Sequence, residues 1–414
     1  MRTITQLTEA LFAKDGDAPV KVALPHTWNA QDGQDGEDDG SYWRGMGSYH
    51  LDLPAPIPGT RQYIEFQGAN HVATVYCNGR EIGTHRGGFS TFRYDLTEAM
   101  TEKENILTVE VTNAPSDVYP QMADFTFFGG LYRPVRLIQV PAAHFDLLKT
   151  GTTGLFITPH VAGLVRVDAF PVNAEGCTVR VDLCDASGAV VATGTAPAEA
   201  HTVLKLQVAD PHLWNGRIDP YLYTAKATLL DGGDEMDEVT ATFGFRSFHV
   251  DSNLGFFLNG KSYPLHGVAR HQDRLDMGWA ITPKEHAEDI ALIQEVGANT
   301  IRLAHYQHDQ VFYDLCDQTG MVIWAEIPFI SRFNPSQAAH DNTISQMTEL
   351  IAQNYNHPSI FFWGISNEIT IGGESEPLYQ NLCELNALCK RLDPSRLTTM
   401  AELTMVPMDS EHVY

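Results

Sequence analysis

The sequence predicts a multidomain protein of β and α/β class, on three observations. Its 414 residues are too many for one domain at roughly 150 residues each. Up to about residue 250, short runs alternate apolar and polar residues without a helical period. Beyond that point, apolar strands alternate with amphipathic helices. We therefore expect domains at 1–143, 147–250 and 251–414, the first two being β-sandwiches and the third a parallel α/β domain.

The sequence pattern of the first region, 1–143, is typical of a β-sandwich. Strands are expected at 63–66, 73–76, 106–111 and 135–138. Asn78-Gly79 is the strongest hairpin signal in the chain, because both residues accept a positive φ. Many short strands without a helical period predict a β-sandwich or jelly roll.

The second region, 147–250, repeats this pattern on a smaller scale. Period-two alternation is clearest at 165–169, 178–183 and 203–208. Roughly 100 residues of short strands are typical of an immunoglobulin-like sandwich.

The third region consists of repeated strand–helix units. Thr282 to Glu285 form a capping box with proline at the first helical position, and the helix that follows presents Ile290, Ile293 and Val296 before Gly297 ends it. Strands are expected at 263–268, 299–303, 321–327, 359–365 and 397–403. This order predicts a (β/α) barrel or a doubly wound sheet. Residues 412–414 could begin a sixth strand, so a barrel of eight would be cut short.

Composition excludes several classes of partner. The formal charge of −25 repels phosphate backbones, so no nucleic acid is expected. No apolar run approaches the ~18–20 residues that span a bilayer, so no membrane is expected either. The first residues lack the apolar stretch of a secretory signal, and six cysteines are too few for a disulfide scaffold. These features predict a cytoplasmic protein with reduced cysteines.

Polar side chains collect where the parallel strands are expected to end. Along the chain they are His266, His271, Arg302, His305, Glu326, Asn367, Glu368 and Glu402. Functional groups of such folds lie at these strand ends, so the set predicts acid–base work on a polar substrate. Glu368 is the sharpest candidate, because a carboxylic acid beside an apolar strand keeps its proton, as a general acid must.

Simpler explanations remain open for these residues. Glu368 could instead form a salt bridge with Arg302 or cap the next helix. A metal cluster is the alternative for His266, His271, His305 and His308. No pair among these histidines has the spacing of a zinc motif, so no metal is predicted.

Two long segments resemble the signatures of glycoside hydrolase family 2. Residues 354–368 (NYNHPSIFFWGISNE) resemble its acid/base signature, and residues 299–306 (NTIRLAHY) resemble its other signature. Shorter matches at 24–28, 129–133 and 244–246 extend the resemblance over nearly the whole chain. The resemblance implies a jelly-roll β-sandwich, an immunoglobulin-like β-sandwich and the first part of a (β/α)8 TIM barrel.

The resemblance also implies roles for individual residues. The family cleaves β-glycosides with retention, using one carboxylic acid as proton donor and a second carboxylate as nucleophile. Glu368 matches the general acid/base, and Asn367 the residue that binds the sugar 2-hydroxyl. The remaining matches are substrate-contacting His271 and His305, Asp124 lent by the jelly roll to the sugar pocket, and Arg302 and Glu326 in the pocket floor.

This chain departs from the family pattern in two ways. The family's nucleophilic glutamate is expected beyond residue 414, and neither Glu326 nor Glu402 matches its motif. We therefore expect the 414-residue chain alone to be inactive, and its unclosed barrel to aggregate. The segment after Glu326 lacks the Glu and His that bind magnesium in some galactosidases. The sequence thus predicts no metal and no cofactor.

The leading functional hypothesis is a retaining hydrolase of terminal β-D-galactosides. A β-glucuronidase of the same family is the nearest alternative, although the acidic chain mildly opposes an anionic substrate. A non-catalytic carbohydrate-binding protein is the third. Its candidate sugar-stacking residues are Trp28, Tyr42, Trp43, Phe89, Phe127 and Phe128, for which core packing is the competing explanation. The sequence leaves open whether the protein is a homo-oligomer.

Overall fold

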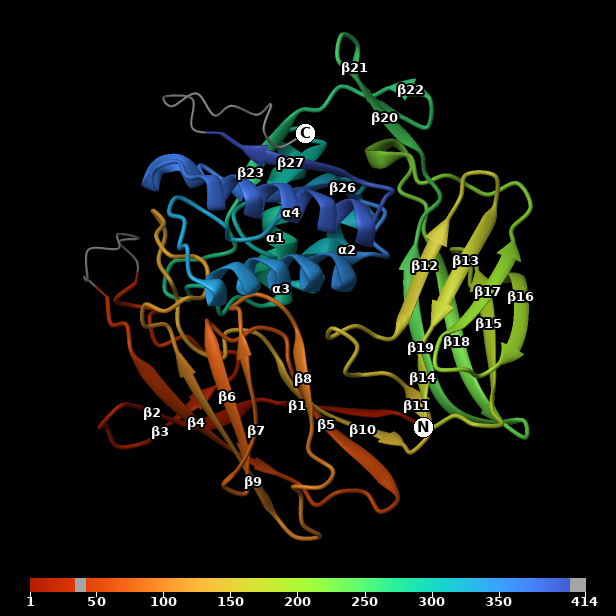
Figure 1. Ribbon diagram of the computed structural model, residues 1–414. Coiled ribbons are helices and arrows are strands. Elements are labelled where there is room, and N and C mark those ends of the chain that lie inside the picture. The colour runs from red at the N-terminus through yellow and green to blue at the C-terminus, as the bar shows by residue number, and fades with distance from the viewer. Residues whose placement is uncertain (34–41, 403–414) are drawn as a thin grey trace.

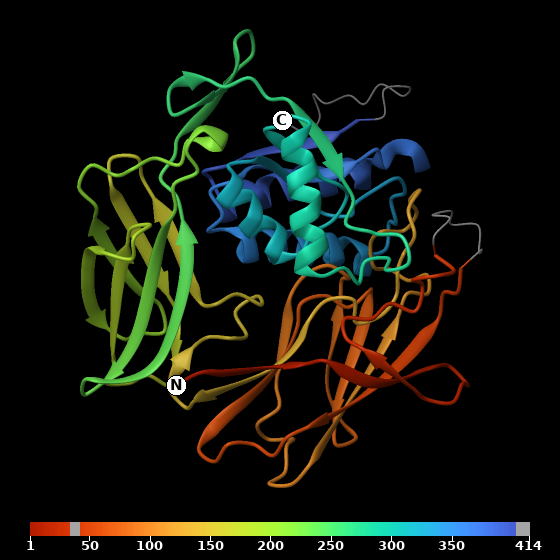
Figure 2. The same cartoon turned by 180° about the vertical axis from the view of Figure 1, so that it is seen from behind.

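Residues 1–33 and 42–402 are described in a computed structural model (Figure 1). The chain forms a jelly-roll β-sandwich, an immunoglobulin-like β-sandwich and a parallel sheet with helices, in that order. The fold class predicted from the sequence is therefore confirmed. The parallel unit lies beside both sandwiches in the two views (Figures 1 and 2).

The jelly roll has two antiparallel sheets of order β1-β10-β5-β8 and β3-β2-β4-β9-β6-β7. Its strands are β1 (Thr3–Leu7), β2 (Glu9–Lys14), β3 (Val20–Ala23), β4 (Met46–Leu53), β5 (Thr60–Phe66), β6 (Val72–Cys77), β7 (Arg80–Arg86), β8 (Phe92–Asp95), β9 (Asn105–Thr112) and β10 (Val135–Pro141). Asn78 and Gly79 have φ of 52° and 79° between β6 and β7, which confirms the predicted hairpin.

The immunoglobulin-like sandwich is built from sheets of order β12-β13-β17 and β16-β15-β18-β19, with the small pair β11-β14. Its elements are β11 (His144–Phe145), β12 (Leu155–Pro159), β13 (Leu164–Ala169), β14 (Pro171–Val172), β15 (Thr178–Cys184), β16 (Val190–Pro197), β17 (Thr202–Gln207), η1 (Gly216–Ile218), β18 (Tyr223–Asp231) and β19 (Asp234–Phe243). Alternate residues of β13 and β15, such as Val165 and Val181, are buried between the sheets, as the period-two pattern predicts.

A small antiparallel sheet that the sequence did not predict connects this sandwich to the barrel. It consists of β20 (Phe248–Asp251), β21 (Gly255–Leu258) and β22 (Lys261–Ser262). Phe256 and Leu258 are buried in one cluster with Trp214 of the sandwich and Phe361 of the barrel. The connection is thus packed against both of its neighbours.

The third unit is a five-stranded parallel sheet of order β23-β24-β25-β26-β27. Its elements are β23 (Gly267–Arg270), α1 (Pro283–Glu295), β24 (Thr300–Leu303), α2 (Gln310–Thr319), β25 (Val322–Glu326), α3 (Gln337–Asn354), β26 (Ile360–Asn367), η2 (Ile369–Gly372), α4 (Glu376–Leu392) and β27 (Leu397–Ala401). Consecutive strands are neighbours, as in a barrel. Within the described residues, β23 and β27 each pair on one side only.

Helix termini in this unit follow the capping signals of the sequence. Thr282 and Glu285 form the predicted capping box at the start of α1. Gly320, with φ of 75°, ends α2. Val296, which continues the apolar spacing of Ile290 and Ile293 in the sequence, is the C-terminal cap residue of α1 and is 72% exposed.

The jelly roll and the barrel share an aromatic cluster, called here the junction cluster. It is formed by Phe89, Phe128, Tyr132, Trp279 and Tyr306. Phe89 stacks on Tyr306 with 4.5 Å between ring centroids, so the loop after β24 is packed directly against the jelly roll.

The predicted sixth strand at 412–414 lies outside the described residues. No helix in 1–33 or 42–402 has the length and apolar character needed to cross a membrane.

Candidate active site at the carboxyl ends of the parallel strands

The structure places most of the predicted polar residues at one end of the parallel sheet. Arg302 lies on β24, Glu326 ends β25, and Asn367 ends β26. His271 and His305 follow the ends of β23 and β24. The carboxyl ends of adjacent parallel strands meet at one edge, which brings these side chains together.

Arg302 is the centre of a buried polar network. Its Nε donates to Glu326 Oε2 at 3.0 Å, and its Nη2 donates to Glu326 Oε1 at 2.9 Å. The same Nη2 donates to Asn367 Oδ1 at 2.6 Å. Glu326 is fully buried, so the bidentate pair offsets a desolvation cost that a lone carboxylate could not.

Glu326 also fixes the ring of His305. His305 Nδ1 lies 2.9 Å from Glu326 Oε1 and 3.2 Å from Arg302 Nη2. The carboxylate oxygen only accepts and is the nearer of the two, so the ring proton is assigned to Nδ1. The Nε2 atom of His305 is then left as a hydrogen-bond acceptor. Because Arg302 and His305 engage both of its oxygens, Glu326 is a structural carboxylate and is not free to attack a substrate.

Asn367 is oriented for recognition by the same network. Its Oδ1 accepts from Arg302, so its Nδ2 is left to donate to a ligand, and it forms no hydrogen bond to any described residue. Asn367 is 4% exposed, which limits the rotamers that its amide can adopt. A fixed donor of this kind suits a sugar hydroxyl.

Glu368 follows Asn367 in a left-handed backbone conformation, with φ of 48° and ψ of 31°. Its backbone N–H donates to Ala401 O at 2.9 Å, which ties it to β27. Its half-buried carboxylate forms no hydrogen bond or salt bridge to any described residue. A non-glycine residue with positive φ is uncommon, and such strain is found at functional sites.

The structure excludes both simple explanations for Glu368. Arg302 pairs with Glu326 and not with Glu368. Glu368 precedes the short helix η2, but its side chain forms no capping hydrogen bond. The carboxylate is therefore available for chemistry.

His271 forms the side of the site nearest β23. Its Nδ1 lies 3.2 Å from the hydroxyl of Tyr306, a buried residue of the junction cluster. The rings of His271 and His305 meet edge to face at 5.0 Å. Burial, followed by the nearby His305, lowers the pKa of His271, so its ring is neutral at pH 7 and can exchange hydrogen bonds with hydroxyls.

The jelly roll contributes Asp124 and Phe125 to this region. Phe125 stacks on His305 at 6.1 Å and lies 5.2 Å from His271, measured between ring centroids. Asp124 is exposed and lines a cavity of about 510 Å³ together with His271 and Asp273. Asp124 forms no hydrogen bond to any described residue, so the structure brings it near the histidines without joining it to the network.

Sequence reasoning missed two aromatic residues of the site. Phe125 was not proposed, although it directly follows Asp124, and Trp324 was not proposed although its ring lies 4.6 Å from the guanidinium of Arg302. Only their neighbours in sequence could have pointed to them, because apolar residues have no chemical signature of their own. Phe125 contacts the site across the domain boundary, whereas Trp324 contacts Arg302 from the neighbouring strand.

Two of the predicted polar residues, His266 and Glu402, do not join this network. His266 precedes β23 and is exposed at the opposite end of the sheet, because β23 begins later than predicted. Glu402 follows β27 and is exposed. Of the proposed sugar-stacking aromatics, all but Trp43 are buried, which fits core packing.

A separate group at the amino end of β26 has the composition of a metal site. The ligand atoms of Asp314, Asp317 and His357 lie within 4.8 Å of one another. His357 Nδ1 lies 2.6 Å from Asp317 Oδ2, and Asp317 Oδ1 accepts from the backbone of Ser359. Burial alone favours a neutral His357, but the Asp317 carboxylate outweighs it and raises the His357 pKa. The hydrogen bond between His357 and Asp317 accounts for the proximity of these two side chains.

Three family models match successive parts of the chain. Residues 13–141 match the glycosyl hydrolases family 2 sugar binding domain, residues 156–246 match glycosyl hydrolases family 2, and residues 250–411 match the family 2 TIM barrel domain. The chain belongs to glycoside hydrolase family 2.

Individual relatives divide between two specificities. A beta-glucuronidase of Bacteroides fragilis is 38% identical over 92% of this chain and 58% of its own length. A beta-galactosidase of Thermoanaerobacter pseudethanolicus is 29% identical over 84% of this chain and 47% of its own. The solved structure of an FMN-binding beta-glucuronidase from Facaelibacterium prausnitzii L2-6 is 46% identical, with a TM-score of 0.95 over 98% of this chain and 64% of that one. This chain therefore spans about half to two thirds of the length of these proteins.

Proposed function

We propose that this chain forms the greater part of a retaining β-glucuronidase, with Glu368 as the general acid/base. The observation that supports the catalytic role is the unpaired, half-buried carboxylate of Glu368 beside the oriented amide of Asn367. The glucuronidase specificity is supported by relatives of that name at 38% and 46% identity, against 29% for the galactosidase. This order reverses the expectation from the sequence, which favoured β-galactosides.

In the proposed reaction, the sugar lies over the network of Arg302, Glu326 and His305. The protonated Glu368 gives its proton to the glycosidic oxygen as the bond to the leaving group breaks, and it later takes a proton from the attacking water. Asn367 Nδ2 donates to the 2-hydroxyl, and this bond strengthens as positive charge develops at the anomeric carbon.

The nucleophilic carboxylate is proposed to come from residues beyond 414. Among the described residues, Glu326 has both oxygens engaged by Arg302 and His305, and Glu402 is exposed after β27. Glu326 is therefore not free to attack the anomeric carbon, and Glu402 does not match the nucleophile motif of the family. The prediction that the chain alone lacks turnover follows from this point.

A β-galactosidase is the second candidate. Exposed Asp124 and neutral His271 face one cavity and could bind the hydroxyls of galactose. The carbohydrate-binding module is less well supported, because most of its proposed stacking residues are buried.

A panel of nitrophenyl glycosides tests this proposal. The substrates are the β-D-glucuronide, β-D-galactoside and β-D-mannoside, and the enzyme is the chain extended to the length of its relatives. We expect kcat/KM to be highest for the glucuronide by at least about a hundredfold. A site built to bind the glucuronate carboxylate leaves its own polar groups unpaired when a neutral sugar binds. A higher value for the galactoside would reject the specificity.

The isolated 414-residue chain is the matched control in the same assay. We expect it to release no nitrophenol above the rate of a Glu368→Gln variant. Turnover by the isolated chain that is lost in Glu368→Gln would show that the second carboxylate lies within these residues.

A further inference from the structure

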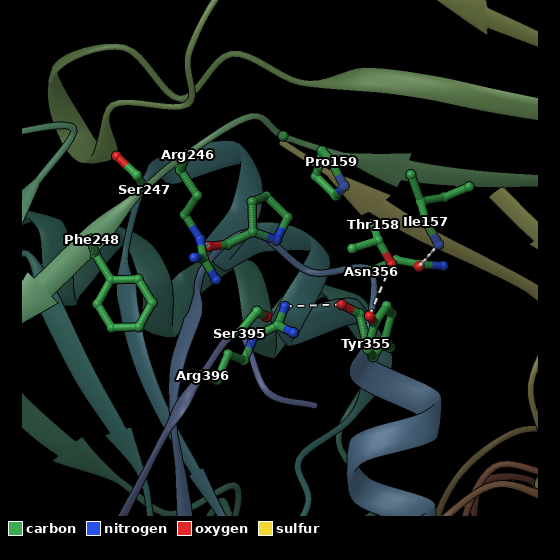
Figure 3. Close-up of a pocket in the computed structure, with 12 residues that line it drawn as sticks. Ile157, Thr158, Pro159, Arg246, Ser247, Phe248, Tyr355, Asn356, Ser395 and Arg396 are labelled. Atoms are coloured by element: carbon green, nitrogen blue, oxygen red, sulfur yellow. Dashed lines mark hydrogen bonds between the residues drawn. The ribbon is translucent and has the colours of Figure 1, made fainter. Parts of the chain in front are cut away.

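A second polar cavity lies at the opposite end of the parallel sheet from the candidate active site (Figure 3). It has a volume of about 220 Å³ and separates the immunoglobulin-like sandwich from the barrel. Thr158 on β12 lines one side and Arg396, just before β27, lines another. Figure 3 shows Arg246, from the segment after β19, extending toward Arg396.

Two guanidinium groups meet in this cavity. Arg246 Nη2 donates to Ile360 O at 2.5 Å, and Arg396 Nε donates to the same carbonyl at 2.9 Å. Arg246 Nε also donates to Pro358 O. Sharing one acceptor at the start of β26 holds two positive charges close together, which is unfavourable without a counter-ion.

Only one of the two arginines has an acidic partner. Arg396 Nη1 donates to Asp393 Oδ2 at 2.6 Å, and Asp393 is fully buried. Arg246 forms no salt bridge within residues 1–33 and 42–402, and its Nη1 donates to none of them. Burial, and after it the charge of Arg396, lower the Arg246 pKa, although the nearby carboxylates of Asp393 and Asp317 act in the opposite direction.

The surroundings of Arg246 supply no negative charge at the cavity wall. The other lining groups are neutral, among them Ser247, Phe248 and the hydrogen-bonded hydroxyls of Thr158 and Tyr355. The cavity therefore has an excess of positive charge in a chain whose formal charge is −25. This local excess of positive charge attracts small anions, whereas the negative charge of the remaining surface repels large anions.

We propose that this cavity is a binding site for a small oxyanion, held by Nη1 of Arg246 between the sandwich and the barrel. Guanidinium groups bind phosphate and carboxylate oxygens through short, charge-assisted hydrogen bonds. A volume of about 220 Å³ accommodates phosphate or acetate and excludes a polysaccharide. Since the cavity is formed by both domains, the anion stabilises their junction, and the site is independent of glycoside hydrolysis.

Isothermal titration of the chain extended to the length of its relatives with sodium phosphate tests the proposal, and sodium acetate is a second titrant. We expect a dissociation constant on the order of 1 mM, weakened by added sodium chloride, as for a few charge-assisted hydrogen bonds. Tighter binding of phosphate assigns the site to a tetrahedral oxyanion, and tighter binding of acetate assigns it to a carboxylate. Binding of neither contradicts the proposal.

Two variants locate the site. Ser247→Glu places a carboxylate beside Arg246 from an exposed position and should weaken phosphate binding at least tenfold. Ser252→Glu, at an exposed position in the turn between β20 and β21, adds the same charge and should bind like the parent. Arg246→Met should abolish binding. If Arg246→Met does not fold, the test is the comparison of phosphate binding by Ser247→Glu and Ser252→Glu. Equal binding by these two variants overturns the proposal.

Discussion

The two ends of the parallel sheet use the same chemistry for different purposes. At the carboxyl ends, Arg302 donates to the side chains of Glu326 and Asn367. At the amino ends, Arg396 donates to the backbone oxygens of Tyr355, His357 and Ile360. Both arginines have a fully buried carboxylate as partner.

The difference lies in what each arginine holds in place. Arg302 positions side chains that keep unused hydrogen-bonding atoms, such as Asn367 Nδ2 and His305 Nε2. Arg396 uses its donors on the Asp393 carboxylate and on three backbone oxygens, so it holds chain segments together and orients no side chain of the candidate active site. In barrel folds, the carboxyl ends of the strands form the active site and the amino ends provide stability. This division explains why charge is buried at both ends.

The largest expected effect separates Glu368 from other carboxylates at the same end. In the extended enzyme, Glu368→Gln should lower kcat/KM for an aryl glucuronide about a thousandfold, the usual contribution of a general acid. Its melting temperature should stay within a degree or two, because the carboxylate makes no hydrogen bond to a described residue. Glu402→Gln, an exposed carboxylate after the next strand, is the matched control and should retain activity. Equal losses in the two variants would remove Glu368 from the mechanism.

The second effect compares the two arginines directly. Arg302→Met and Arg396→Met each leave a buried carboxylate unpaired, so each should lower the free energy of unfolding by about 3 kcal/mol in urea titrations. Only Arg302→Met should also lower kcat at a temperature where both variants are folded. Exposed Arg332→Met is the control and should change neither quantity. A fall in kcat for Arg396→Met would show that the two ends are coupled.

The third effect concerns Phe125, which reaches the carboxyl end from the jelly roll. Phe125→Ala removes a ring that packs on His271 and His305, so KM for an aryl glycoside should rise about fivefold with little change in kcat. The half-buried Phe156 of the second sandwich is the matched position, and Phe156→Ala should leave KM unchanged. An unchanged KM in Phe125→Ala would restrict this residue to a packing role.

The smallest expected effect is on the pH dependence of the free energy of unfolding. His357 and His271, at opposite ends of the parallel sheet, should contribute to it with opposite signs. The His357 pKa is raised, so the stability it contributes is complete below its ordinary value and is lost as pH rises through the raised pKa. The His271 pKa is lowered, so its contribution is present above the ordinary value and is lost as pH falls through the lowered pKa. Each slope is at most about 1.4 kcal/mol per pH unit, since one proton is involved.

Urea titrations of His357→Gln and His271→Gln between pH 5 and 8 measure these slopes as differences from the parent. We expect the difference for His357→Gln to shrink as pH rises, and that for His271→Gln to shrink as pH falls. If the two differences changed with pH in the same direction, the direction of the pKa shift of either His357 or His271 would be wrong.

The sequence predicted the fold wherever local signals agree with tertiary packing. The hairpin at Asn78-Gly79 and the capping box at Thr282 are set by backbone conformation, which neighbouring residues determine. The apolar spacing of α1 continues to Val296, although the helix ends at Glu295 and Val296 is exposed as its cap residue. The short sheet of β20 to β22 was missed because its strands depend on packing against Phe361.

The candidate site was predictable in its residue types but not in its connections. Arg302, Glu326 and Asn367 were expected at one place, yet the sequence left open whether Arg302 would pair with Glu368. Arg302 pairs with Glu326 because of the burial of that carboxylate and the bidentate geometry of the two side chains, which only the folded chain defines. The order of the two specificities could not be predicted from these residues, because the motif that distinguishes glucuronate was expected beyond residue 414.

The junction cluster has a practical consequence for protein engineering. Its five rings come from two domains, so exchanging the jelly roll with that of a relative would replace Phe89, Phe128 and Tyr132 while leaving Trp279 and Tyr306 behind. Interior aromatic packing tolerates such mismatches poorly. Recombination that moves all five rings as one module should preserve folding, whereas a crossover placed at the apparent linker should not.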